Sequence, residues 1–291
     1  MRPFAWEQPD RLADAVALLA AHGPRARLLA GGTDLIIRLR DRSIEPDVVI
    51  DVKRVRELDD GIRERDGRLV IGARTVMTDI AADERIRRDY TALAEGALVV
   101  GSVQIRNRAT LSGNICNASP AADTAPALLV FGAVVVAVGP NGERRIPIDD
   151  LFVRSGVTTL RPAELVTAIE LPLPGPPRGS THTRRTRRRG HDLASVTVAC
   201  VVDRDGATTI AYGSVGPRPV LVSDRSGILA DPSASAEDRR RVLDGLFAGA
   251  SPSPTSMRAS PEYRVAMLRV HGLRAVQTAL ARLADTGEAR Q

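Results

Sequence analysis

The sequence predicts two domains of mixed helix and strand, an α/β unit first and an antiparallel hairpin in the second, and three observations lead to this prediction. The N-terminal part alternates between strand and helix patterns, as an α/β unit does. Beyond a proline-rich stretch, two β-branched runs flank an Asp-Gly turn, which is typical of an antiparallel hairpin. The length of 291 residues fits two domains of roughly 100–200 residues each.

The first unit is expected to run strand, loop, helix, strand. Residues 10–21 have apolar side chains at helical spacing, and we expect Asp10 to cap this helix. A short apolar run at 28–30 ends at a glycine pair, and a second helical pattern covers 34–40. The β-branched run 48–52 then predicts a buried strand.

The middle of the chain continues with both patterns. Ser119 and Pro120 have the form of an N-cap and a first-turn proline, so we expect a helix from there to Val130. The other elements expected here are strands at 68–73, 133–138 and 165–171 and helices near 77–82 and 93–100.

The second domain is expected to begin after a linker. Residues 171–180 are rich in proline and glycine, which favours an extended connection. The hairpin consists of strands 195–202 and 207–214 around the turn 203–206. Two helices follow at about 236–248 and 261–284, the second capped by Ser260.

Composition excludes several classes of protein. Two cysteines are too few for a four-cysteine iron–sulfur site or a disulfide framework. No apolar run approaches the ~18–20 residues of a membrane span, and the N-terminus lacks the apolar stretch of a secretory signal, so we expect a cytoplasmic protein. The histidines show no metal-ligand spacing and no catalytic triad stands out, so we expect neither a metal site nor a catalytic residue.

The charge is unevenly placed. The chain has 41 basic and 35 acidic residues, a net charge of +6, and only Lys53 among the basic residues is not arginine. The one dense basic run is either a solvated strand face or a contact with a partner or a cofactor; it comprises Arg184, Arg185, Arg187, Arg188 and Arg189. An aromatic content of 3% argues against nucleic-acid binding, where bases stack on exposed rings.

The first candidate site is the turn Leu29-Ala30-Gly31-Gly32-Thr33-Asp34-Leu35. Glycines after a strand allow positive φ and leave no Cβ to obstruct a ligand. Successive amides can then point at one anion, and Thr33 can donate its hydroxyl to a phosphate oxygen. An ordinary strand-to-helix turn explains the same residues, so both interpretations stay open at this point.

The second candidate site is the long polar stretch 101–123. Side chains that can bind an anion or a sugar hydroxyl recur along it, namely Thr110, Ser112, Asn114, Ser119 and Asp123. Single apolar residues interrupt the stretch at regular places, which a disordered loop would not need. Ordered loops of this length in compact domains are usually functional.

Together the two segments resemble the FAD-binding, or medium, subunit of the molybdenum hydroxylases, the group of xanthine dehydrogenase and carbon monoxide dehydrogenase. The resemblance lies in 29–35 followed by Gln104-Ile105-Arg106-Asn107 and Thr110-Leu111-Ser112-Gly113-Asn114. It continues at Glu170-Leu171-Pro172, at 213–219 and at 260–264, and so covers nearly the whole chain. Ser112 stands where relatives usually have glycine, so the backbone there needs a negative φ.

The resemblance implies the fold in more detail. Residues 1–174 would form an FAD-binding domain of the p-cresol methylhydroxylase type, with two α+β subdomains at about 1–53 and 54–174. Residues 175–291 would form a smaller C-terminal domain of antiparallel sheet and helices.

The resemblance also implies which residues hold the cofactor FAD. Residues 30–35 would hold the diphosphate through backbone amides, Gly101 would lie close to the flavin, and Ile169 would meet the ring through its strand backbone. Asp123 would bind ribose or ribityl hydroxyls, and one arginine of 184–188, most simply Arg187, would approach the flavin. The full set is Leu29, Ala30, Gly31, Gly32, Thr33, Asp34, Leu35, Gly101, Thr110, Ser112, Gly113, Asn114, Asp123, Ile169 and Arg187.

The function implied is electron transfer inside a complex. FAD would collect electrons from a separate 2Fe-2S subunit and pass them to an external acceptor, while a subunit with the molybdenum cofactor oxidises the substrate. A stand-alone FAD-dependent reductase on the same fold is the first alternative. A basic nucleic-acid-binding protein is the alternative from another class.

Overall fold

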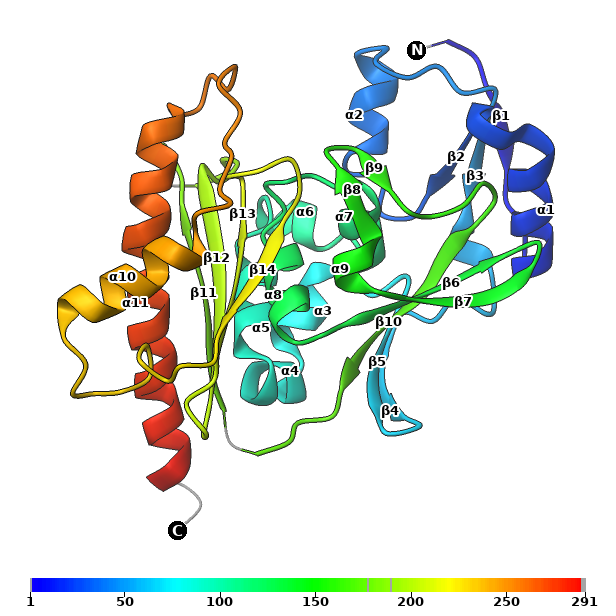
Figure 1. The fold of residues 1–291 in the computed structure, drawn as a ribbon. Helices are drawn as coiled ribbons and strands as arrows, with labels where there is room; N and C mark the ends of the chain where they lie inside the picture. The colour runs from blue at the N-terminus through cyan, green and yellow to red at the C-terminus, as the bar shows by residue number, and fades with distance from the viewer. Residues whose placement is uncertain (1, 177, 189, 289–291) are drawn as a thin grey trace.

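The computed structural model describes residues 2–176, 178–188 and 190–288, which form three sheet-based units in a row (Figure 1). The N-terminal unit, in blue, lies at one side and the long C-terminal helix, in red, at the other. Parallel strands occur in the first unit, whereas the sheets of the other two are antiparallel. The predicted α+β class is therefore confirmed.

The N-terminal unit is a parallel sheet of three strands in the order β1-β3-β2. Strand β3 is buried along its whole length, as its β-branched run predicted. One face of α1 buries Ala15, Val16 and Leu19 in the core beside this sheet. In chain order the elements are β1(Ala5–Glu7), α1(Leu12–His22), η1(Gly23–Arg25), β2(Ala26–Leu29), α2(Leu35–Arg40), β3(Val48–Asp51) and η2(Val52–Arg54).

The prediction that Asp10 caps the first helix was wrong. Arg11 occupies the N-cap position, and no side chain bonds the first-turn amides from there. The Asp10 carboxylate instead pairs with Arg54 at 3.3 Å, and the amide of Leu12 donates to Glu57 at 3.1 Å. Groups from later in the chain therefore replace the local cap.

The central unit is an antiparallel sheet of five strands in the order β4-β5-β10-β6-β7, with helices on it. β10 lies in the middle, so its backbone pairs on both sides. The unit contains β4(Ile62–Arg65), β5(Arg68–Gly72), α3(Met77–Ala82), α4(Glu84–Asp89), α5(Thr91–Leu98), α6(Val103–Arg106), α7(Leu111–Cys116), α8(Thr124–Val130), β6(Val134–Gly139), β7(Gly142–Pro147), α9(Ile148–Leu151), β8(Phe152–Arg154), β9(Val157–Thr158) and β10(Leu165–Pro172).

The helix expected to open at Ser119 and Pro120 begins later. It starts at Thr124 with Asp123 at the N-cap position, and Ser119 forms a turn by accepting from the amide of Ala121 at 3.3 Å. The carbonyl of Pro120 accepts from the amide of Ser214 at 2.7 Å. This contact with the C-terminal unit takes up a carbonyl that a helix would have used, and the sequence pattern gave no sign of it.

The C-terminal unit is an antiparallel sheet in the order β11-β12-β13-β14, and its central hairpin matches the prediction. The expected linker 171–180 is shorter than predicted, because β11 already begins at Arg178; Pro177 lies outside the described residues. A Cβ at Gly179 would lie 1.8 Å from the carbonyl oxygen of Ala279, so this glycine permits close packing on α11. The elements are β11(Arg178–Arg185), β12(Val196–Asp203), β13(Thr208–Gly213), β14(Val220–Asp224), α10(Ala236–Leu246) and α11(Pro261–Glu288).

The C-terminal sheet is covered on both faces. Val198, Cys200 and Tyr212 point into a core with α10 and α11. Ala199 and Ala211, one residue along each strand, belong to the core of the central unit. Figure 1 shows α11 on one side of this sheet and α5 and α8 on the other. The two predicted domains therefore share a continuous core.

Polar contacts reinforce this interface. Glu95 of α5 accepts hydrogen bonds from the hydroxyl of Thr181 at 3.1 Å and the amide of His182 at 2.7 Å, both in β11. Its other oxygen accepts from Arg282 of α11 at 2.5 Å. One carboxylate thus joins three elements and fixes β11 against α5.

Candidate functional site

The first candidate turn has the backbone that its glycines predicted. Strand β2 ends at Leu29, and Gly32 has φ 76°, a conformation that favours glycine. Thr33 and Asp34 lead into α2, which begins at Leu35. Asp34 is exposed, but partial desolvation raises the pKa of its carboxyl, although Arg38 acts in the opposite direction. Ala30 and both glycines of the turn are partly buried.

The two candidate segments, far apart in sequence, are in direct contact. A Cβ at Gly31 would lie 2.1 Å from the carbonyl oxygen of Arg108 and 3.1 Å from the Cα of Ala109. No side chain fits between these backbones. Gly31 therefore joins the first turn to the second segment, and the backbone at Arg108 is a part of the site that the motifs did not indicate.

The second segment is not a long loop but two short helices with a turn between them. Ser102 caps α6 by accepting from the amide of Ile105 at 3.3 Å. Gly101 has φ 54°, and a Cβ there would lie 2.6 Å from Cγ2 of Ile105. Thr110 caps α7 by accepting from the amide of Gly113 at 3.1 Å.

The polar side chains of α7 are engaged by neighbours. The buried hydroxyl of Ser112 donates to the carbonyl of Ala73, and Ser112 lies within a helix, so its φ is negative as expected. Asn114 accepts from the hydroxyl of Thr124 at 2.7 Å. These contacts tie α7 to the residue that follows β5 and to the start of α8, and they leave Gly113 exposed.

Asp123 lies at the point where α8, β11 and β12 meet. It is 7% exposed, and one carboxylate oxygen, Oδ2, accepts from Nη1 of Arg184 at 2.8 Å. The other oxygen, Oδ1, is buried, and none of the described residues gives it a hydrogen bond. Nε2 of His182 lies 3.6 Å from it. Asp123 is therefore a buried carboxylate whose contacts come from the C-terminal unit.

The arginine run divides into separate contacts. Arg184 reaches Asp123, while Arg185 donates to the hydroxyl of Tyr263 at 2.8 Å. Arg187 is exposed and pairs with Asp192 at 3.3 Å, and this hydrogen bond holds the pKa of Asp192 below its usual value. Arg189 lies outside the described residues. Among the predicted candidates, Arg184 is the one brought to another predicted site residue.

Ile169 lies at the centre of β10. It pairs with Ile71 of β5 on one side and Val135 of β6 on the other, and its side chain is fully buried. The backbone of Ile169 is buried together with its side chain, because the residue as a whole is 0% exposed. Its role stays a prediction.

Sequence reasoning missed His182 and Thr197 beside Asp123. The imidazole Nε2 of His182 lies 2.8 Å from the hydroxyl of Thr197. Strand periodicity was the signal that could have found His182, because residues 182 and 184 of one strand share a face. Thr197 pairs with Arg184 in the β11–β12 register, which a sequence alone does not reveal.

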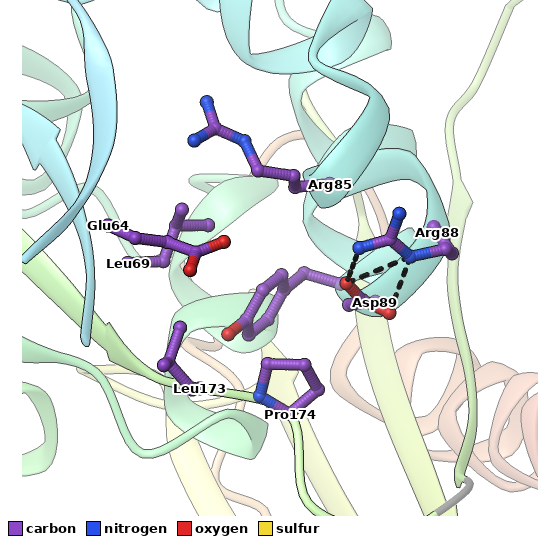
Figure 2. A pocket seen from close by; sticks show the side chains of 8 residues that line it. Glu64, Leu69, Arg85, Arg88, Asp89, Leu173 and Pro174 are labelled. Atoms are coloured by element: carbon purple, nitrogen blue, oxygen red, sulfur yellow. Dashed lines mark hydrogen bonds and ion pairs between the residues drawn. The ribbon is translucent and has the colours of Figure 1, made fainter. Parts of the chain in front are cut away.

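A separate cavity of about 200 Å³ lies between the β4–β5 hairpin, α4 and the start of the linker (Figure 2). Its arginines are paired with neighbouring carboxylates, Arg88 with Asp89 and Arg85 with Asp83. Tyr90 also lines it, and burial raises the pKa of this phenol to about 12. None of its lining residues belongs to either candidate segment, so this cavity is not the predicted site.

Within the described ranges, no cluster of three or more histidine, cysteine or acidic side chains is arranged to hold a metal ion. In the same part of the chain, no helix is both long and apolar enough to cross a membrane.

Comparison with known proteins identifies the family. Residues 2–174 match the family model of the FAD binding domain in molybdopterin dehydrogenase, and residues 181–279 match the CO dehydrogenase flavoprotein C-terminal domain. The chain is 31% identical to the carbon monoxide dehydrogenase medium chain of Hydrogenophaga pseudoflava, over 97% of this chain and 98% of that one. It is 30% identical to the xanthine dehydrogenase FAD-binding subunit of Escherichia coli O157:H7, over 95% and 96%.

Solved structures agree with the sequence comparisons. The fold matches the reconstituted CO dehydrogenase of Oligotropha carboxidovorans with a TM-score of 0.89 and 30% identity, covering 97% of this chain and 99% of that chain. The corresponding values for carbon monoxide dehydrogenase of Hydrogenophaga pseudoflava are 0.88, 31%, 97% and 99%. The chain therefore belongs to the family of FAD-binding subunits of molybdenum hydroxylases, and it is an oxidoreductase flavoprotein whose cofactor is FAD.

Proposed function

We propose that this chain is the electron-transfer subunit of a cytoplasmic molybdenum-containing hydroxylase. It takes electrons from a separate 2Fe-2S subunit and passes them to an external acceptor, while a third subunit with the molybdenum cofactor oxidises the substrate. The observation that carries the proposal is the contact of Gly31 with the backbone at Arg108, which makes one binding surface from two glycine-bearing segments.

The residues present fit FAD. Gly31 and Gly32 present backbone without side chains, and Thr33 adds a hydroxyl next to them. We assign the diphosphate to this turn, because successive amides can bind phosphate oxygens. Gly101 is assigned to the flavin by the family resemblance, and its positive φ and its packing on Ile105 keep this position free of a side chain.

The second segment would hold the other side of the cofactor. Thr110 and Gly113 contribute from the first turn of α7, and Asn114 follows them. Because the hydroxyl of Ser112 already donates to Ala73, this residue would act through its backbone.

Asp123 and an arginine complete the proposed site. Asp123 would accept hydrogen bonds from ribose or ribityl hydroxyls, and its Oδ2 is the oxygen next to Arg184. Of the arginine run, Arg184 has better support than Arg187 as the cation near the flavin, because Arg187 is exposed and paired with Asp192. The resemblance also assigns the backbone of Ile169, which the structure buries in the middle of β10.

Bound FAD would supply the redox chemistry, accepting and releasing electrons one or two at a time. The chain's own residues bind and orient it, and no side chain is assigned as a catalytic acid or base. Cys116 and Cys200 cannot hold a four-cysteine cluster. This supports an electron source on another chain.

The test begins with the purified chain and added FAD. We expect flavin absorbance bands to remain after gel filtration, and we expect the chain to co-purify with iron–sulfur and molybdenum subunits from its own cells. A chain that binds no flavin would refute the proposal. A free monomer that reduces its own substrate with NADPH would favour a stand-alone reductase instead.

A residue test locates the diphosphate. Gly32→Asp is expected to abolish FAD retention, because it brings a carboxylate into the turn that would hold an anion. Gly32→Asn is the matched control: it carries no charge but has nearly the same shape, the same strain of the positive φ and the same contact of its Cβ with Leu29. Equal FAD content in the two variants, each checked for folding by circular dichroism, would show that the diphosphate lies elsewhere.

A further inference from the structure

The inner oxygen of Asp123 lacks the donor that a buried carboxylate needs. Oδ1 is shielded from solvent, and no described residue hydrogen-bonds it, whereas Oδ2 has Arg184. Leaving a buried acceptor without a partner costs free energy, more so when the group is charged. A donor within a small movement of Oδ1 would therefore stabilise the carboxylate in its present orientation.

His182 is in position to be that donor. Its Nε2 lies 3.6 Å from Oδ1 of Asp123 and 2.8 Å from the hydroxyl of Thr197. The imidazole is almost fully enclosed, with 2% of its side chain exposed, and Thr197 is completely buried. Because the imidazole is enclosed, Nε2 has no access to solvent. The hydroxyl of Thr197 and Oδ1 of Asp123 are the hydrogen-bond partners within its reach.

The backbone holds His182 at this place independently of its ring. Its amide donates to Glu95 at 2.7 Å, and Glu95 is itself bound by Arg282 at 2.5 Å. Arg184, two residues along the same strand, occupies the outer oxygen of Asp123. Two carboxylates therefore meet His182, Glu95 at its backbone amide and Asp123 at its imidazole, and each is paired with an arginine.

We propose that His182 is a positioning residue for the cofactor site, which rests on the proposed role of Asp123 in binding FAD. His182 carries a proton on Nε2 and shares it between Thr197 and Oδ1 of Asp123. With Arg184 on Oδ2, both carboxylate oxygens are then held by residues of β11. The C-terminal domain thereby sets the orientation in which Asp123 meets the hydroxyls of FAD.

The test compares two substitutions of His182 by titrating FAD into the full chain. His182→Leu fills the space but removes the donor, and we expect the FAD dissociation constant to rise about tenfold. His182→Gln restores an amide donor at nearly the same reach, and we expect most of the affinity to return. Equal affinity in wild type and the leucine variant, or a glutamine variant as weak as the leucine variant, would overturn the proposal.

His271 provides the matched control. It is a buried histidine of α11 that bonds the hydroxyl of Thr183 at 2.9 Å, and the charges acting on it are those of Arg185 and Arg274 rather than a carboxylate. His271→Leu is expected to leave FAD affinity unchanged. If it weakens binding as much as His182→Leu, packing alone explains both effects and the proposal fails.

A second measurement uses the FAD-free chain. Thermal unfolding midpoints of His182→Leu, Asp123→Ala and the double variant form a cycle. Asp123 bonds no helix amide with its side chain, so alanine there removes the carboxylate without removing a cap. We expect His182→Leu to lower the unfolding midpoint much less in the Asp123→Ala background than in wild type. If the effects of the two substitutions simply add in the double variant, the contact between the two side chains is refuted. If the wild-type chain binds no FAD, the proposed function is overturned instead. The cycle would still show whether His182 and Asp123 interact.

Discussion

At the scale of single residues, the site depends on two glycines, which have no side chain. Gly31 lets two backbones touch, and Gly32 adopts a left-handed backbone conformation that turns the chain toward α2. The two glycines are neighbours in sequence but are needed for different reasons. Gly31 allows a close backbone contact, and Gly32 allows a positive φ.

Gly31→Ala is expected to destabilise the chain by about 1–3 kcal/mol or more, because its Cβ would overlap the carbonyl of Arg108 and force two backbones apart. Urea unfolding at constant pH measures this change in the free energy of unfolding. Gly245→Ala in α10 is the control: it has open space around it and ordinary helical φ, so it should be neutral or slightly stabilising. Similar losses in both variants would show that the contact at Gly31 is unimportant.

The arginine run shows what a sequence can and cannot predict about single residues. Composition located the run, and the resemblance placed one of its arginines near the flavin. Which arginine turns inward depends on the pairing of Arg184 with Thr197 and on the position of Asp123 at the start of α8. Strand register and tertiary packing decide this, and neither is written in the local sequence.

At the scale of elements, the strongly patterned segments were predicted well. The strands at β3, β5, β6, β10 and the β12–β13 hairpin, and the helix capped by Ser260, lie close to where periodicity and turn residues put them. Short exposed strands such as β4 and β7 were missed, because three consecutive charged residues in each leave no alternating apolar pattern. The first turn of α8 was misplaced, since Pro120 is used by the C-terminal unit.

One ion pair at this scale gives a pH prediction. Arg144 of β7 binds Glu164 with two hydrogen bonds, at 3.0 and 2.7 Å, just before β10 begins. This side-chain bond lowers the pKa of Glu164, and the amide of Arg161 adds to the effect. A folded-state pKa below the unfolded one adds stability that is present above the unfolded pKa of about 4.3. The stability is lost as pH falls through the folded value.

Glu164→Gln is therefore expected to cost about 1–2 kcal/mol at pH 7, and progressively less as the pH falls below about 4. Urea denaturation of both proteins across this range measures the difference. Glu143→Gln, an exposed neighbour of Arg144 in the same strand, should differ little from wild type at any pH. A gap between Glu164→Gln and wild type that stays constant down to acid pH would contradict the prediction.

At the scale of the whole molecule, the predicted boundary near residue 174 lies between two matched family models, but it does not divide the hydrophobic core. The family matches change between residues 174 and 181. The core of the central unit nevertheless includes Ala199, Val201 and Ala211 from the C-terminal sheet. Sequence patterns could predict the change in element type at this point, but not that α5 and α8 would use the sheet's second face.

Residues 1–174 made alone are expected to expose the apolar faces of α5 and α8 and to aggregate or remain loosely packed. Binding of a dye that fluoresces on apolar surfaces, compared with the full chain, measures this exposure. The full chain carrying Glu95→Gln is a milder comparison. This variant weakens the hydrogen bonds between α5 and β11, but the C-terminal sheet still covers α5 and α8. A soluble fragment that excludes the dye and unfolds cooperatively would show that the shared core is dispensable.

The contact between Asp123 and Arg184 also sets an order of events during synthesis. The two residues are 61 positions apart, and β11 is held in turn by a helix at the very end of the described chain. While the ribosome is still making the C-terminal unit, the glycine turns and Asp123 have already emerged, but the carboxylate has no cation beside it. On the proposed role of Asp123, we therefore expect FAD to bind only after α11 has been made.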